Sequence, residues 1–361
     1  MVTIQLQNLI DFVADVFNHA ESSAEEARRI ATYLTTANLT GHDSHGVIRV
    51  PVYIRWKKMG SVVPNQTAEL VVDTPSLAVV DGKFGYGQTV APQAVRIGIE
   101  KCKKAGLSAV ALRNAGHIGR VGDWAEMAAA EGLVSVHFVN AAGSLLVAPY
   151  GGVEKRLSTA PYCVGVPREG EDPIVLDFAT SIVAEGKVLV ASRGGKKLPK
   201  GALIDADGTL SEDPHVLYGP YISDGARDHT TGTGAIRAFG EHKGSGLAFI
   251  CELLGGALTG TGATAPNRRF ANGMLAFYID PRVVDPAHFF DGEISRYVDF
   301  IRETKPVAGG EPVMVPGDAE RKTRADRTRN GIPLPDDTWA AIVNTAREVG
   351  VGEASIQRAV A

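Results

Sequence analysis

The segment around His45 combines a group that can carry a proton with a group that can bind an anion. Ser44 precedes this histidine, and Arg49 and Tyr53 follow it at four-residue steps. In a helix, these steps place the three side chains on one face. A guanidinium matches a carboxylate with two parallel hydrogen bonds, and an imidazole titrates near neutral pH. The segment therefore predicts a carboxylate-binding site, although a polar helix end with an ordinary histidine has the same pattern.

A second histidine, His117, lies between glycines in residues 116–122. It follows an apolar stretch over 107–112 that is typical of a strand, and it precedes an expected helix over 121–131. Glycines let another molecule approach the backbone, and active sites of α/β proteins gather where strands lead into helices. The pattern indicates an acid or base, with a loop histidine packed against a sheet as the alternative.

Two further segments place a charged group at the end of an expected element. Asp177 ends an apolar strand over 174–177, where it can cap a helix expected near Thr180, orient a histidine or hold a ribose hydroxyl. Lys243 precedes an expected helix over 245–258, whose free amides and dipole favour phosphate. Ordinary helix capping explains the pattern at Asp177 equally well, and an N-cap followed by tight helix packing explains the pattern at Lys243.

Composition narrows the class of protein. The 361 residues are 44% apolar and 22% charged, which suits a packed protein of two or three domains. A net charge of −4 argues against a globally basic nucleic-acid binder. The three cysteines form no Cys-x-x-Cys pair, which favours a reducing cytoplasm. Polar residues interrupt the N-terminus where a secretory signal would be apolar, and the apolar stretch 246–259 is shorter than a membrane span. We therefore expect a cytoplasmic protein with no membrane or nucleic-acid partner.

Strands and helices alternate along most of the chain, which indicates α/β architecture. An amphipathic helix is expected over 4–19, and Ser22 with Glu25 forms the pattern of a capping box that opens a second helix. Residues 193–235 have the composition of a long irregular excursion, of the kind used as lids or binding segments. The basic run over 321–329 is interspersed with acidic residues and is typical of a solvated helix face.

Common nucleotide-binding and hydrolase signatures are missing. The glycine pairs at 85–87 and 232–234 lack the third glycine of the Rossmann fingerprint. The sequence also has no Walker A loop and no Gly-x-Ser-x-Gly nucleophile elbow. A standard dinucleotide fold, a nucleoside triphosphatase and an α/β-hydrolase are therefore unsupported.

Seven motifs in a fixed order resemble the malate/L-lactate dehydrogenase family, which lacks the Rossmann fold. Relatives in this group include ureidoglycolate and sulfolactate dehydrogenases, diketogulonate reductase and piperideine-2-carboxylate reductase. Each motif is weak alone, and the order of all seven along nearly the whole chain is specific. The motifs are Ser44-His45-Gly46 with Arg49, Gly116-His117-x-Gly119, Pro149-Tyr150-Gly151-Gly152, Leu176-Asp177-Phe178-Ala179-Thr180, Gly186-Lys187, His242-Lys243-Gly244 and Glu252-Leu253-Leu254-Gly255-Gly256.

The resemblance implies an α/β, non-Rossmann NAD(P)-binding fold with a largely antiparallel sheet flanked by helices, plus a helical domain built from both chain ends. The implied domains are 1–75 with about 305–361 for the helical domain, 76–120 with about 240–304 for the cofactor-binding domain, and 121–239 for a further α/β part. A homodimer with its active site between domains is also implied.

The resemblance also implies roles for individual residues. His117 would be the acid/base, with His45 and Asp177 as further catalytic candidates. Relatives often carry serine, asparagine and tryptophan where this chain has Ala141, Ala160 and Ala202, which leaves the substrate open. The implied substrate-binding residues are Ser44, His45, Arg49, Tyr53 and Thr159, and the implied contacts to NAD or NADP are Asn140, Ala141, Asp177, Phe178, Ala179 and Lys243.

Together these features predict an oxidoreductase that moves a hydride between NAD(P)H and a small 2-oxo or 2-hydroxy acid. His117 would exchange a proton with the substrate oxygen while Arg49 clamps the carboxylate. Arg120 is a candidate phosphate contact because it lies near His117 in the sequence, and no metal is expected. The alternatives are a reductase of a cyclic imine carboxylate, a non-catalytic small-anion binding module, and a metal-dependent hydratase using His42 and His45.

Overall fold

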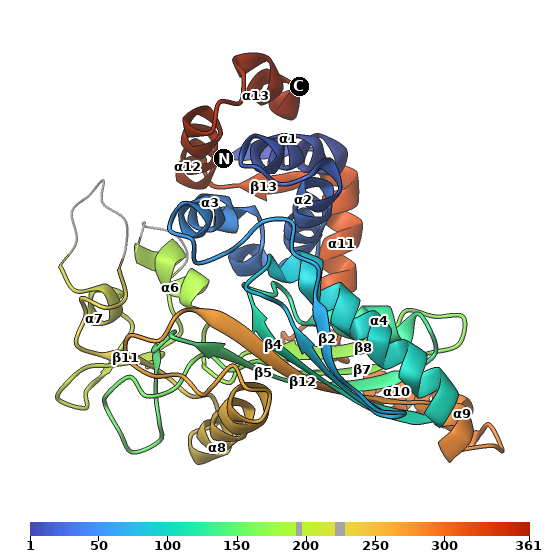
Figure 1. Cartoon of the computed structure of the whole chain (residues 1–361). Helices are drawn as coiled ribbons and strands as arrows, with labels where there is room; N and C mark the ends of the chain where they lie inside the picture. Colours follow the sequence, from blue (N-terminus) through green and yellow to red (C-terminus); the bar gives the residue numbers. More distant parts are fainter. Residues whose placement is uncertain (193–196, 221–227) are drawn as a thin grey trace.

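The computed structural model describes residues 1–192, 197–220 and 228–361, and it centres on one seven-stranded sheet (Figure 1). The strand order is β2-β3-β4-β12-β5-β7-β8. The β3–β4 pair is parallel and every other neighbouring pair is antiparallel, which confirms the expected largely antiparallel sheet. The strands are β2 (Glu69–Asp73), β3 (Leu77–Asp81), β4 (Leu107–Ala115), β5 (Val134–Ala142), β7 (Tyr162–Val166), β8 (Ile174–Phe178) and β12 (Ala271–Ile279).

Helices α4 (Gly87–Ala105) and α5 (Gly122–Ala129) pack against the sheet and enclose an apolar core. Gly98 allows α4 to lie close to the central strand, because a Cβ atom there would stand 2.2 Å from the ring of Tyr278 on β12. Trp124 of α5 is fully buried in the same core. The sheet and these two helices form a rigid platform for the loop that follows β4.

A helical part is built from both ends of the chain, as expected, and lies at the top of Figure 1. Strand β1 (Val2–Ile4) pairs antiparallel with β13 (Ile332–Leu334), which joins the two ends directly. Phe17 and Ile30 pack in one core with Ile342. The helices are α1 (Leu6–His19), α2 (Ala24–Leu39), α3 (Val50–Lys58), α11 (Asp318–Asn330), α12 (Asp336–Glu348) and α13 (Glu353–Val360).

The expected capping box at the start of α2 is wrong by one residue. Ser23 is the cap, and its hydroxyl accepts a hydrogen bond from the backbone N–H of Glu26 at 3.2 Å. Ser22 is instead buried, and its hydroxyl has no partner in the described part of the chain. Two serines in succession both satisfy the sequence pattern, and the backbone conformation selects the second.

The excursion expected over 193–235 is not irregular where the structure describes it. It supplies β9 (Leu203–Ile204), β10 (Leu210–Ser211) and α7 (His215–Tyr218) to a small sheet of order β10-β9-β11-β6. The apolar residues Ala202 and Leu203 are buried against this sheet, and their burial stabilises it. Residues 193–196 and 221–227 of the excursion lie outside the described residues. The other two strands are β6 (Val147–Ala148) and β11 (Ala235–Arg237).

The remaining elements lie around the sheet edges, and some begin at other residues than expected. The expected helix near Thr180 begins only at Glu185, as α6 (Glu185–Ser192). The helix expected over 245–258 is α8 (His242–Cys251), followed by a π-helical turn, η3 (Glu252–Ala257). Within the described residues, no helix is long and apolar enough to cross a membrane. The other elements are η1 (Asp43–His45), η2 (Val47–Arg49), α9 (Pro281–Val284) and α10 (Phe289–Arg302).

The strands β5, β7 and β8 belong to the segment 121–239, yet they lie in the same sheet as β3, β4 and β12. The cofactor-binding part and the further α/β part that the sequence suggested therefore share one sheet. The domain boundaries themselves stay a prediction.

Candidate active site

The segment around His45 is not one continuous helix. His45 ends the short turn η1, Arg49 ends η2, and Tyr53 lies on α3. Gly46 allows the break between the two turns, because a Cβ atom there would stand 2.1 Å from the side-chain oxygen of Asn38 on α2. That oxygen accepts a hydrogen bond from the N–H of Val47 at 2.8 Å, so α2 fixes the path of the segment.

Hydrogen bonds hold the polar side chains of this segment in one cluster. The Ser44 hydroxyl lies 2.9 Å from Nδ1 of His45, and Nε of Arg49 donates to the carbonyl oxygen of Ser44 at 2.6 Å. A terminal nitrogen of Arg49 lies 3.7 Å from the carboxylate of Glu185 on α6. Gly186 brings α6 against η1, because its Cβ atom would stand 2.6 Å from that of Ser44.

His117, from the loop after β4, joins this cluster although it lies far away in the sequence. Its ring stacks on that of His45 with centroids 5.5 Å apart and an interplanar angle of 17°. The hydroxyl of Tyr53 lies 2.6 Å from its Nδ1. Trp56 and Phe270 lie beside the same ring, with centroids 6.5 and 6.4 Å away. The described residues provide no hydrogen bond to Nε2, so this nitrogen is available to a ligand.

The electrostatics of the cluster favour neutral rings beside one positive charge. Burial, with a smaller contribution from the guanidinium of Arg49, lowers the pKa of His117 to about 3. Burial, His117 and Arg49 together hold the pKa of His45 well below its usual range. Burial also raises the pKa of Tyr53, which keeps its hydroxyl protonated. At pH 7 the cluster therefore presents one cation and two uncharged imidazoles, which suits the binding of an anion.

Asn140, expected to contact the cofactor, is fully buried on β5 and its side chain is occupied. Its amide nitrogen donates to the carboxylate of Glu252 at 3.1 Å and to the carbonyl oxygen of Gly262 at 2.9 Å. Its amide oxygen accepts from the N–H of Gly273 at 3.1 Å. We call Asn140, Glu252 and these partners the Asn140–Glu252 network. The neighbouring Ala141 donates its N–H to the hydroxyl of Ser158 at 3.3 Å.

Asp177 caps a helix, but not the one expected near Thr180. Its carboxylate accepts a hydrogen bond from the N–H of Gly122 at 2.7 Å, where α5 begins. This contact ties the end of β8 to the loop that carries His117. The second carboxylate oxygen of Asp177 is not used in that bond.

The other expected contact residues near β8 surround the same turn. The ring of Phe178 packs on those of Tyr162 and Phe239, with centroids 5.9 and 5.3 Å apart. The carbonyl oxygen of Thr159 accepts the N–H of Thr180 at 3.0 Å. Ala179, like Thr159, is half-buried.

Lys243 lies exposed in the first turn of α8. It is not among the residues whose hydrogen bonds hold the His117 cluster together. The backbone around it leaves room for a bound group, because a Cβ atom at Gly240 or Gly246 would meet nothing within 4 Å. A cation beside the N-terminus of a ten-residue helix is suited to phosphate. The residues present here fit the pyrophosphate of a dinucleotide.

Arg120 is not a free phosphate contact. Its guanidinium is buried and paired with the carboxylates of Asp123 and Glu126, each at 2.8 Å. Its closeness to His117 in the sequence is misleading, because Arg120 lies just before α5 and pairs with two carboxylates of that helix. His42 is likewise occupied, at 3.2 Å from Glu320. No group of three or more potential metal ligands occurs among residues 1–192, 197–220 and 228–361.

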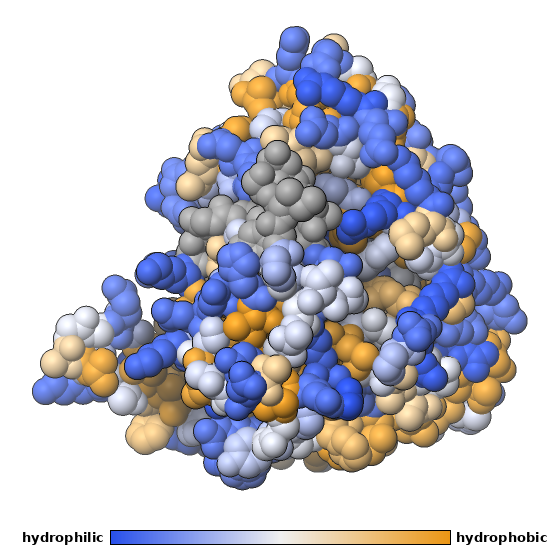
Figure 2. Space-filling view, turned by 90° about the vertical axis from the view of Figure 1, so that its left-hand side faces the viewer, coloured by the Kyte–Doolittle hydropathy of each residue, from blue (hydrophilic) through white to orange (hydrophobic). Residues whose placement is uncertain are grey.

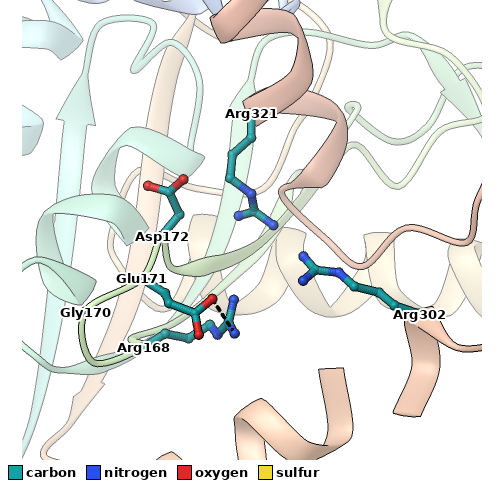
Figure 3. A pocket seen from close by; sticks show the side chains of 6 residues that line it. All are labelled: Arg168, Gly170, Glu171, Asp172, Arg302 and Arg321. Carbon is teal, nitrogen blue, oxygen red and sulfur yellow. Dashed lines mark ion pairs between the residues drawn. The ribbon is translucent and has the colours of Figure 1, made fainter. Parts of the chain in front are cut away.

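A separate cavity of about 550 Å³ lies at the loop between β7 and β8 (Figure 3). Arg168, Arg302 and Arg321 point toward it, but carboxylates offset their charges. Arg168 pairs with Glu171 at 2.7 Å, and Asp318 pairs with both Arg302 and Arg321. None of the residues expected to be functional lines this cavity, which also includes Gly170 and Asp172.

Sequence reasoning missed three residues that shape the site. Gln88, at the start of α4, donates to the hydroxyl of Tyr53 at 3.0 Å, and Glu185 faces Arg49. Asn272 on β12 donates to the carbonyl oxygen of Asn140 at 2.6 Å and accepts from the N–H of Ile118 at 2.9 Å. Asn272 thereby joins the His117 loop to the Asn140–Glu252 network. The only sequence signal for Gln88 is its place after Gly85-Tyr86-Gly87, a pattern that by itself indicates no more than an incomplete fingerprint.

The mixed α/β fold, with its largely antiparallel sheet flanked by helices, matches solved structures of malate/lactate-type dehydrogenases. The sequence matches the malate/L-lactate dehydrogenase family over residues 4–343. The chain therefore belongs to this family.

Individual relatives agree with that assignment over nearly the full length of both chains. Hydroxycarboxylate dehydrogenase B of Escherichia coli is 37% identical over 358 residues, which cover 97% of this chain and 95% of the relative. A solved Escherichia coli structure assigned to the malate/lactate dehydrogenases superposes with a TM-score of 0.92 at 35% identity and full coverage of both chains. The structure of Δ1-piperideine-2-carboxylate reductase from Pseudomonas syringae has a TM-score of 0.78 at 29% identity and covers 97% of this chain and 100% of its own.

Proposed function

We propose that this protein transfers a hydride between NAD or NADP and a small 2-oxo or 2-hydroxy acid, with His117 as the acid/base and Arg49 as the carboxylate clamp. One observation carries the proposal. Among the described residues, nothing bonds to Nε2 of His117, and this ring lies in a half-buried cluster with the guanidinium of Arg49, which faces the carboxylate of Glu185. The E. coli relative named a hydroxycarboxylate dehydrogenase supports the substrate class.

The chain's own residues supply orientation and proton transfer. The terminal nitrogens of Arg49 bind the substrate carboxylate in competition with Glu185, which lies 3.7 Å away, and Ser44 and His45 border that position. Burial is the main cause of the low pKa of His117, and the substrate carboxylate would offset the smaller contribution of Arg49, so substrate binding shifts this pKa upward. General acid assistance from the ring then contributes about 10²–10⁴-fold to the rate of reduction. In the oxidative direction, the neutral ring accepts the hydroxyl proton. Thr159 is a further substrate contact in this proposal.

The cofactor would be held by residues that leave room for it. Lys243 and the N-terminus of α8 would hold its pyrophosphate, and Asp177 offers one carboxylate oxygen to a ribose hydroxyl. Phe178, Ala179 and Ala141 would line the same path, and Asn140 would support it through the backbone because its side chain is occupied. When bound, the nicotinamide supplies or accepts the hydride.

A second candidate reaction is the reduction of a cyclic imine carboxylate. The solved piperideine-2-carboxylate reductase favours it, because that protein shares the fold. The same carboxylate clamp serves both substrates, and only the atom that faces Nε2 of His117 changes, from oxygen to nitrogen.

We also propose a homodimer that works in the cytoplasm on small molecules. The end of α8 and the η3 turn expose the apolar side chains of Phe249, Ile250, Leu253 and Leu258. Figure 2 shows apolar patches in the lower half of the molecule, among hydrophilic residues. Exposed apolar patches of this kind are typical of subunit interfaces.

The test is a substrate panel with purified protein. Pyruvate, oxaloacetate, sulfopyruvate and a cyclic imine carboxylate would each be assayed with NADH and with NADPH by absorbance. Turnover of a 2-oxo acid supports the proposal, and preference for the imine by more than tenfold in kcat/KM selects the second candidate. Binding of the acids without turnover of any of them would leave an anion-binding module and refute both reactions.

A further inference from the structure

The hydroxyl of Tyr53 lies at the centre of a small, fully buried hydrogen-bond arrangement. Three polar atoms surround it: Nε2 of Gln88 at 3.0 Å, Nδ1 of His117 at 2.6 Å, and the carbonyl oxygen of His117 at 3.3 Å. Tyr53 and Gln88 are each 1% exposed. A hydroxyl can donate one hydrogen bond and accept two, so its single proton must choose between the ring and the carbonyl group.

The distances identify where that proton lies at rest. An O–H donor makes bonds of about 2.5–3.0 Å, so Nδ1 of His117 lies within this range and the carbonyl oxygen lies beyond it. The amide nitrogen of Gln88 can only donate, so it fills one lone pair of the Tyr53 oxygen. Donors therefore follow one direction, from Gln88 to Tyr53 to His117. With Nδ1 acting as an acceptor, the neutral ring carries its proton on Nε2.

Resting on the function proposed above, we infer that Gln88 is a positioning residue. Through Tyr53, it sets the tautomer of His117 and so presents an N–H group at Nε2 to the reacting oxygen or nitrogen of the substrate. Nothing in the family assignment or in the named relatives points to this glutamine. Tyr53 is thereby a partner of the imidazole, and its hydroxyl is withdrawn from the direct substrate contact that the sequence suggested.

Proton transfer requires the Tyr53 hydroxyl to take a second orientation, in which its proton points to the carbonyl oxygen of His117. When the ring becomes an imidazolium, Nδ1 also carries a proton and must donate, so the Tyr53 O–H turns to the carbonyl oxygen of His117 and its oxygen accepts from Nδ1. In reduction, the ring takes up a solvent proton at Nδ1; the Nε2–H bond then breaks, the proton joins the substrate oxygen, and its electron pair stays on Nε2, which leaves a neutral ring protonated on Nδ1. In oxidation, this second tautomer accepts the hydroxyl proton of the substrate at Nε2, and the Nδ1 proton then returns to solvent, which restores the resting tautomer. The hydride comes from the nicotinamide of the proposed function. Gln88 donates to the same oxygen in both positions, so the proton can turn while the ring stays in place.

The backbone makes this arrangement rigid. Gly87, the first residue of α4, lies so close to the loop that a Cβ atom there would stand 2.3 Å from the carbonyl oxygen of His117. The titratable or charged groups that face the ring are His45 from η1, Arg49 from η2 and Tyr53 from α3. Among residues 1–192, 197–220 and 228–361, no carboxylate faces this ring, so the direction of the hydrogen bonds selects the tautomer.

The first test is nitrogen NMR of the full-length protein labelled with 15N-histidine at pH 7.5, with the His117 signals assigned by difference from His117→Gln. We expect protonated Nε2 and unprotonated Nδ1 in the wild type. A His117 ring protonated on Nδ1 in the wild type would overturn the inference. This measurement needs no turnover, so it stays readable even if the substrate panel refutes the proposed function.

Three variants separate positioning from simple structural support. Gln88→Met removes the donor with little change of volume, and Tyr53→Phe removes the hydroxyl. For each we expect a mixed tautomer and a loss in kcat of about tenfold, with KM for the acid within about threefold, because one hydrogen bond is lost from the acid/base and not from the carboxylate clamp. Gln88→Glu places a carboxylate where the donor was, so at pH 8 it should accept the Tyr53 O–H and move the ring proton to Nδ1.

Tyr86→Phe is the matched control. Tyr86 packs in the same aromatic cluster, 5.9 Å from Tyr53 between ring centroids, and its buried hydroxyl has no partner in the described part of the chain. We expect wild-type kcat and tautomer for this variant. If Gln88→Met and Tyr53→Phe fold as the wild type does by thermal melting and keep its tautomer and kcat, Gln88 has no positioning role.

Discussion

Two polar clusters, one half-buried and one buried, lie on either side of β12, and they differ in what they leave unused. Within the described residues, the His117 cluster keeps Nε2 of its central ring without a hydrogen bond, and Arg49 has only a 3.7 Å contact with Glu185 at its terminal nitrogens. In the Asn140–Glu252 network, every polar atom of the Asn140 side chain has a partner from the chain itself. Asn272 joins the two clusters. An unused buried atom indicates chemistry, whereas a satisfied one indicates structure.

The largest effect that this comparison predicts is on turnover. His117→Gln keeps a polar side chain of similar size but cannot be protonated. We expect kcat to fall by about 10²–10⁴-fold with the melting temperature little changed, since general acid/base catalysis is lost. Steady-state kinetics and thermal melting measure both. A kcat within threefold of the wild type would show that another group moves the proton.

The second prediction concerns the closed network. Asn140→Ala leaves the carboxylate of Glu252, the carbonyl oxygen of Gly262 and the N–H of Gly273 without this partner. The free energy of unfolding should fall by about 2–4 kcal/mol, because buried polar groups lose hydrogen bonds. Urea denaturation measures this loss. Unchanged stability together with a raised KM for the cofactor would move Asn140 from the structural cluster to the binding site.

The third prediction tests the clamp. Arg49→Lys keeps the charge but loses the planar pair of donors, so KM for the acid should rise by about 10–100-fold. Arg282→Lys is the control, because Arg282 makes the same kind of two-pronged pair with Asp280 at the surface, at 2.8 Å. Equal effects of the two variants on KM would contradict a specific role for Arg49.

The fourth prediction uses pH to compare a buried histidine of the site with one of the sheet. Burial lowers the pKa of His137 on β5 to about 3, as it does for His117. Each ring binds its proton near pH 6.5 when unfolded. Stability is therefore complete above pH 6.5 and falls as the pH drops toward 3, by about 1.4 kcal/mol per pH unit for each ring.

His137→Leu should reduce the number of protons taken up on unfolding by one, which makes the change of stability with pH less steep, and it should leave kcat unchanged. Its ring contacts Tyr278 and the hydroxyl of Ser135, and it makes no contact with the His117 cluster in the described residues. Urea denaturation from pH 4 to 8 gives the slope. An unchanged slope would mean that His137 is already charged in the folded protein.

The smallest expected effect is at Glu185. Its carboxylate lies 3.7 Å from Arg49 and also accepts a hydrogen bond from the hydroxyl of Tyr218 at 2.5 Å. It competes with the substrate carboxylate for the same cation, so Glu185→Gln should lower KM by about two- to fivefold. Progress curves at low substrate concentration measure this change. A raised KM would show that Glu185 helps to orient Arg49.

Part of the fold and of the candidate site could be predicted from the sequence. The motif order identified the family and the antiparallel sheet. The four-residue spacing of His45, Arg49 and Tyr53 predicted one helical face, whereas the structure divides the segment into η1, η2 and α3. The residue pattern alone could not predict that His117 completes the cluster. The contact between Tyr53 and His117 spans 64 positions and depends on the path of the loop after β4.

Other features leave no local signal. Strands of two residues, such as β9 and β10, are too short for an alternating pattern, so the excursion looked irregular. Asn140 and Arg120 were assigned to ligands because polar side chains look the same in a sequence whether their partner is a ligand or the chain. Only coordinates show that Glu252 and Asp123 already occupy them.

The pairing of β1 with β13 has a consequence for biosynthesis. The helices that carry Phe17 and Ile30 leave the ribosome early, but their apolar faces are covered in part by Ile342 and Ile356, which are translated more than 300 residues later. During that interval the nascent chain exposes hydrophobic surface, which chaperones recognise. The segment 47–58, which packs against α12, therefore reaches its final environment only after the distal helices have been synthesised.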